Sequence, residues 1–104
     1  MATFHIKRGD TSPALRYALR PTTVDLTGAS VVFNVRGVLT RAPASIVTAS
    51  PPVVEYAWQP GDTDKLGLRP AEFEVTYPGG GVETFPTGDT IENTLNVNVI
   101  ADMG

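Results

Sequence analysis

The chain of 104 residues contains no cysteine, one histidine and no apolar run long enough to cross a bilayer. Without cysteine, disulfides and cysteine-ligated metal sites are excluded. Eight basic residues are scattered among eleven acidic ones, so no basic patch predicts binding to nucleic acid or to an anionic membrane. The N-terminal residues lack the apolar region of a signal peptide, and we expect the protein to fold in a cytoplasm.

Helical spacing of apolar residues is also missing from every segment. Instead, 10 glycines and 9 prolines separate short runs in which apolar and polar residues alternate. This pattern is typical of strands with one buried face. We therefore predict an all-β fold with a single domain over residues 1–104, an antiparallel β-sandwich, with a small β-barrel as the alternative.

The clearest strand signal lies in Leu68–Pro86. Its apolar and polar residues alternate, so one face is expected to be buried and the other solvated. A turn at Pro78–Gly81 can reverse the chain, since consecutive glycines adopt positive φ values easily. An extended pattern then resumes over Val82–Phe85. The segment predicts a β-hairpin to which the other strands are added.

Further alternating runs predict six more strands. We place them at Thr3–Arg8, Ala14–Arg20, Ala29–Arg36, Ala44–Thr48, Val53–Trp58 and Thr94–Ile100. Ala29–Arg36 is rich in β-branched residues, and we expect it to be a central strand. Thr3–Arg8 and Ala14–Arg20 are expected to be edges, and Thr94–Ile100 could serve in the same way.

Candidate catalytic and metal-binding residues are few. His5 lies on the polar side of an expected strand, and Glu72 and Glu74 share a solvated face, which is the ordinary way to keep a sheet soluble. The loop Asp62–Asp64 offers two carboxylates, too few for a Ca²⁺ cage, so turn capping is the better interpretation. We expect no enzyme activity, no catalytic residues, no metal and no cofactor.

Tyr56 and Trp58 allow two interpretations. Exposed aromatic rings would form a stacking platform for a sugar. However, both residues share a face with Val54 at a spacing of two, which favours burial in the core.

Edge strands carry free N–H and C=O groups that can pair with another chain. We therefore expect contacts with partners through the terminal segments, where Arg16 and Arg20 would meet acidic groups and the asparagines would offer uncharged hydrogen bonds. The candidate interaction residues are Phe4, Ile6, Arg16, Arg20, Asn96 and Asn98.

Several short segments, taken together, resemble a known family. They are Phe4-x-Ile6-Lys7-x-Gly9-Asp10-Thr11-x-Pro13, Val24-Asp25-Leu26-Thr27-Gly28-Ala29 with Val31-x-Phe33-x-Val35-Arg36, Val54-x-Tyr56-x-Trp58, Asp62-Thr63 with Gly67, and Ala71–Pro78 with Gly80 and Glu83–Pro86. Their order and spacing resemble the N-terminal domain of the baseplate upper proteins of tailed bacteriophages, and related small stand-alone phage and prophage proteins. The resemblance runs from Phe4 to about Val99.

The resemblance implies an immunoglobulin-like β-sandwich that acts as a structural module in a virion assembled in the host cytoplasm. It implies contacts with other virion proteins of the tail, baseplate, neck or capsid, in symmetric copies or as a homo-oligomer. The chain stops at Gly104 without the stalk of the larger proteins, which favours a small accessory subunit of the tail or baseplate. A head or neck decoration protein and a carbohydrate- or receptor-binding module remain as alternatives.

Overall fold

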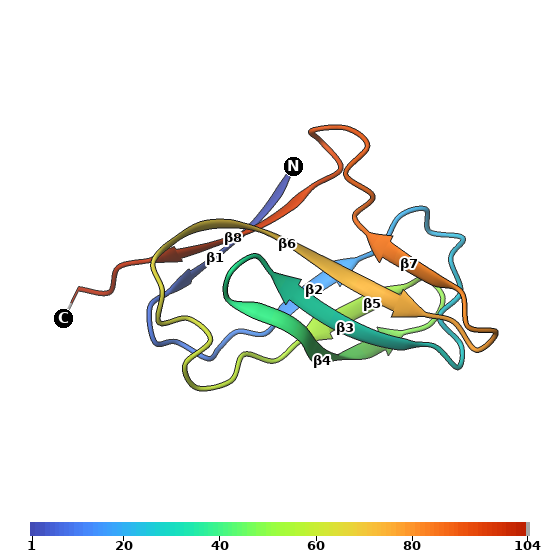
Figure 1. Cartoon of the computed structure of the whole chain (residues 1–104), viewed down its shortest axis with the longest axis horizontal. Coiled ribbons are helices and arrows are strands. Elements are labelled where there is room, and N and C mark those ends of the chain that lie inside the picture. Colours follow the sequence, from blue (N-terminus) through green and yellow to red (C-terminus); the bar gives the residue numbers. More distant parts are fainter. Residues whose placement is uncertain (104) are drawn as a thin grey trace.

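A computed structural model describes residues 1–103 as strands joined by turns and loops (Figure 1). Within that range no residue is helical, which confirms the all-β prediction. The strands are β1 (Ala2–Lys7), β2 (Leu15–Ala18), β3 (Ser30–Val35), β4 (Leu39–Thr48), β5 (Val53–Tyr56), β6 (Gly67–Thr76), β7 (Val82–Phe85) and β8 (Leu95–Ile100).

The strands are hydrogen-bonded in the order β1-β8-β6-β3-β4-β5-β2, and β7 also pairs with β6. Among these pairings only that of β1 with β8 is parallel. The expectation of a purely antiparallel fold is therefore wrong at β1. The sheet curves around the core until it is nearly closed, and β1 and β2 form its two ends.

The neighbour relations follow those of an immunoglobulin-like sandwich. In that fold strands B, E and D lie together in one sheet and strands C, F and G in the other. Here β2, β5 and β4 are neighbours, as are β3, β6 and β8. Residues 39–44 of β4 pair with β3, whereas residues 45–48 pair with β5. This continuous strand joins the two sheets.

β4 begins five residues earlier than the predicted Ala44–Thr48. The early part contains Pro43 and a β-bulge at which Arg41 has a φ of +52°. Two tertiary contacts support this unusual backbone: the Arg41 N–H donates to Oδ1 of Asn34 at 2.7 Å, and Nη1 of Arg41 lies 2.6 Å from Oε1 of Glu74. The sequence of β4 alone does not show these supports.

β6 is the strand with the most partners. Along one edge it pairs with β3, and along the other its first half pairs with β8 and its second half with β7 (Figure 1). Phe73 and Val75 face the core, while Glu72 is exposed on the opposite face. The predicted hairpin and its buried face are confirmed.

Aromatic rings fill the middle of the core. The ring of Phe33 on β3 lies 4.6 Å from that of Phe73 on β6 and 4.9 Å from that of Tyr56 on β5. Phe33 and Phe73 are fully buried, and Tyr56 is buried too. Offset and tilted aromatic pairs at these separations add to the hydrophobic stabilisation from burial. Within this cluster, the contact of Phe33 with Tyr56 joins one sheet to the other.

We expect Phe73→Ala to lower the free energy of unfolding by about 3–5 kcal/mol, because it removes a fully buried ring and leaves a cavity beside Phe33. Leu68→Ala on the same strand is the matched control. Leu68 is 60% exposed on the opposite face, so its truncation should change stability by about 0.5 kcal/mol or less. Urea denaturation of both variants measures the difference. A larger loss in the Leu68→Ala variant would mean that the two faces of β6 are assigned the wrong way round, and equal stabilities would contradict the burial of Phe73.

Candidate functional site

The two ends of the sheet, β1 and β2, are separated by a groove of about 120 Å³. Leu15 and Leu95 are buried at its base, and the half-buried rings of Phe4 and Tyr17 complete an apolar floor. We call this groove, together with the free edge of β1, the seam. The groove is lined by Ala2, Thr3, Phe4, Leu15, Arg16, Tyr17 and Leu95.

The connection between β1 and β2 is held by Thr63, a buried polar residue. Oγ1 of Thr63 donates to the carbonyl oxygen of Asp10 at 2.8 Å, and its own carbonyl oxygen accepts from the Gly9 N–H at 3.2 Å. Gly9 turns the chain with a φ of +85°, a conformation that glycine adopts without steric cost. These contacts fix the point at which the chain leaves β1, and with it one side of the seam.

Two of the predicted interaction residues, Phe4 and Ile6, point inward from β1. Ile6 is only 4% exposed and belongs to the core, and the Phe4 ring packs against Trp58 with centroids 5.7 Å apart. The Ile6 side chain is therefore not available to a partner, because its alternation places it on the buried face. What β1 offers to a partner is chiefly its backbone edge and its odd-numbered side chains.

The two predicted arginines differ in their surroundings. Nη2 of Arg16 lies 2.9 Å from Oε2 of Glu55, its register partner on β5, so its charge already has a counterpart within the chain. Arg20 is exposed beyond the end of β2, and within residues 1–103 it makes no ion pair. Only Arg20 keeps the unpaired charge that the sequence suggested for both.

Asn96 and Asn98 lie on β8, which is hydrogen-bonded to β1 on one side and to β6 on the other. The expectation that Thr94–Ile100 is a free edge is therefore wrong. Both side chains are half-buried on the outer face of the sheet, where Nδ2 of Asn98 lies 3.3 Å from Nδ1 of His5. His5 is exposed, as predicted.

The predicted turn-capping role of Asp62 is confirmed. Its carboxylate accepts hydrogen bonds from the Tyr56 hydroxyl and from the Gln59 N–H, the latter at 2.8 Å. Of the two glutamates on the solvated face of β6, Glu74 pairs with Arg41. Across the part of the chain that the structure describes, no three His, Cys, Asp or Glu side chains gather as metal ligands would.

Burial of Tyr56 and Trp58 is confirmed as well, since both are core residues. A stacking platform for a sugar would need their faces in solvent, so these rings do not form one. Tyr77 is half-buried, and its hydroxyl donates to Oε1 of Glu83 at 2.8 Å.

The distant segments that carry the family resemblance contact one another. Gly9 and Asp10 bond to Thr63, and Phe33 packs on Phe73. Gly28, with a φ of +74°, lies so close to Pro78 that an added Cβ would be 3.0 Å from its ring. These residues therefore build the fold. Sequence reasoning missed Thr63 as an anchor, because only its contact with Asp10 reveals the role.

Comparison of the chain with protein-family models, with curated proteins and with solved structures found no match. None of the residues that the structure describes belongs to a helix of the length and apolarity needed to span a membrane.

We expect Thr63→Val to lower the free energy of unfolding by about 1–3 kcal/mol, because it removes the hydroxyl that donates to the part-buried Asp10 carbonyl. Thr63→Ser is the matched control, since it keeps the hydroxyl. Amide hydrogen exchange at Gly9 should quicken in the valine variant and stay slow in the serine variant. Equal exchange in both variants would contradict the anchoring role.

Tyrosine ionisation provides a pH test of the fold. Burial raises the pKa of Tyr17, and burial with the hydrogen bond to Glu83 raises the pKa of Tyr77 to about 12. Burial, reinforced by Asp62, also raises the pKa of Tyr56. A raised folded pKa favours the neutral ring, so this stabilisation is complete below the ordinary value of 10.0 and is lost as pH rises towards about 12.

The free energy of unfolding should therefore fall from about pH 10 upward, and Tyr77→Phe should reduce that fall. Ultraviolet absorbance of tyrosinate should rise at a higher pH in the folded protein than in urea. Coincident titrations in the two states would contradict the burial of these hydroxyl groups.

Proposed function

We propose that the chain is a non-enzymatic structural protein of a tailed bacteriophage virion, an accessory subunit of the tail or baseplate region. It assembles in the host cytoplasm and acts through contacts with other virion proteins. Its working parts are surfaces and strand edges, and it needs no cofactor, nucleic acid or membrane.

The observation that carries this proposal is the mutual contact of the resembling segments. Gly9 and Asp10 meet Thr63, and Gly28 meets Pro78, although the partners lie some 50 residues apart in the chain. Segments that depend on one another in this way must keep both their order and their spacing. The segments of the resemblance therefore include the contacts that hold the fold. The assembly role itself comes from the resemblance, since a fold alone does not imply a function.

The seam adds a second support. A sheet that ends in β1 and β2 leaves backbone N–H and C=O groups without a strand beside them. Such edges are used for strand addition between chains. By contrast, the receptor- or carbohydrate-binding alternative loses its best candidate platform, because Tyr56 and Trp58 are in the core.

Particles purified from the bacterial strain that encodes the chain test the proposal. Mass spectrometry of gradient-purified particles should find the chain at a constant ratio to the tail proteins. Its ratio to an abundant host protein, which serves as the control for contamination, should rise at each purification step.

Tailless heads from the same preparation distinguish a position on the tail from a position on the head. Recovery on heads alone would replace the tail assignment with a head decoration role. Recovery in the cell lysate but never in particles would overturn the virion proposal.

A further inference from the structure

We propose that the free edge of β1 binds an extended, acidic segment of a partner protein as an added β-strand. That the partner is a virion protein rests on the proposed function. The strand addition itself rests on the backbone of β1, on the groove beside it and on the charges around it.

The backbone of β1 uses only half of its hydrogen-bonding groups. The Ala2 N–H donates to Thr94 at 2.9 Å and the Arg8 N–H donates to Ile100 at 2.8 Å, so the even-numbered residues face β8. Successive residues of a strand direct these groups to opposite sides. The N–H and C=O groups of Thr3 and His5 therefore face the open side, where no strand among residues 1–103 pairs with β1.

The groove beside this edge can take one apolar side chain from an added strand. The groove has a volume of about 120 Å³, and Phe4, Leu15 and Tyr17 are among the residues that line it. Burying an aliphatic group on that floor removes apolar surface from water on both partners. Backbone pairing would supply affinity, and this pocket would supply a choice of side chain.

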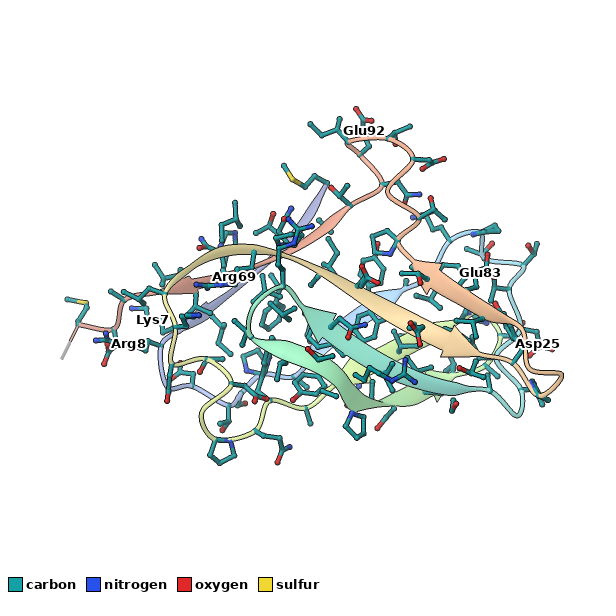
Figure 2. All side chains as sticks on the ribbon, in the orientation of Figure 1. Lys7, Arg8, Asp25, Arg69, Glu83 and Glu92 are labelled. Carbon is teal, nitrogen blue, oxygen red and sulfur yellow. The ribbon has the colours of Figure 1, made fainter. Side chains whose placement is uncertain are left out.

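Charge selects an acidic occupant. Although the whole chain has a net charge of −3, residues 1–9 and 11–24 contain no carboxylate side chain. Lys7 and Arg8 lie together where β1 ends (Figure 2). Arg8 pairs with Asp102, whereas Lys7 forms no ion pair within the described residues. A carboxylate opposite Lys7 would complement this edge.

The same charges disfavour a second copy as the occupant. In an antiparallel pair of two β1 edges centred on His5, Lys7 of each copy would lie opposite Thr3 of the other, and residues 1–9 offer it no carboxylate. An edge lysine is a common protection against self-pairing. The occupant is therefore a different, acidic chain.

The apolar contact at Phe4 and the ionic contact at Lys7 together set the spacing of the matching residues on the added strand. Phe4 and Lys7 are three residues apart and point to opposite faces of β1. An added strand follows the same period, so its apolar residue and its carboxylate should also be three residues apart, roughly 10 Å along the strand. This spacing gives the probe for the first experiment.

The first arm uses synthetic peptides of about nine residues with a leucine and a glutamate three residues apart, in a background of threonine and valine. The control peptide carries lysine in place of the glutamate. Titrated into the full chain, the acidic peptide should slow amide exchange at Thr3 and His5 and bind about ten-fold or more tightly than the control. Equal binding of the two peptides, or no protection at Thr3 and His5, would overturn the inference.

Variants of the chain test which groups of β1 bind the peptide. His5→Pro removes an outward N–H that pairs with nothing, so the fold should survive while peptide affinity falls about ten-fold or more. His5→Ala is its control and should bind normally.

Lys7→Glu should lose the preference for the acidic peptide, whereas Arg36→Glu, the same charge change beyond the end of β3, should keep it. Protection of His5 that grows with chain concentration alone would mean that a second copy is the occupant, against the inference.

The second arm separates this inference from the proposed function. The same variants are supplied to a phage-producing strain from which the chain has been deleted, and their incorporation into particles is measured. Incorporation of the His5→Pro and Lys7→Glu variants at the normal level would show a virion protein that docks by another surface. Peptide binding as expected, with no incorporation of any form including the wild type, would support strand addition and reject the virion role.

Discussion

The structure depends on β6 being paired along both edges while one of its faces is buried. β3 pairs along one edge and β8 and β7 pair in turn along the other, so the register of β6 sets the positions of three other strands. A slip of one residue would move Phe73 and Val75 to solvent and bring Glu72 into the core, which is too costly to tolerate. The remaining strands extend from this fixed register until the curved sheet nearly closes.

Incomplete closure leaves strand edges that are open to assembly. A fully closed barrel has no edge, whereas this sheet ends in β1 and β2. Lys7 on β1, which forms no ion pair within the described residues, discourages pairing between identical edges. In the proposed strand addition it would face a partner of opposite charge. Backbone groups do not depend on side-chain identity. Binding through a strand edge therefore does not require a particular side-chain motif.

The residues that looked most like motifs have architectural roles. Asp62 caps its own loop through Tyr56 and Gln59, Thr63 anchors the connection after β1, and Gly28 allows Pro78 to approach. Each satisfies buried polar groups or close contacts that the fold would otherwise lack. The proposed function of the seam therefore relies on a scaffold whose distinctive residues stabilise the fold.

The sequence by itself determined which face of most strands is buried, because alternation is a local property that one strand displays alone. It identified the inward faces of β3, β5 and β6, the burial of Tyr56 and Trp58, and the capping role of Asp62. It did not reveal the parallel pairing of β1, the early start of β4 or the interior place of β8. Those features, and with them the seam, depend on which strands lie side by side, and only tertiary packing between segments far apart in the chain decides that.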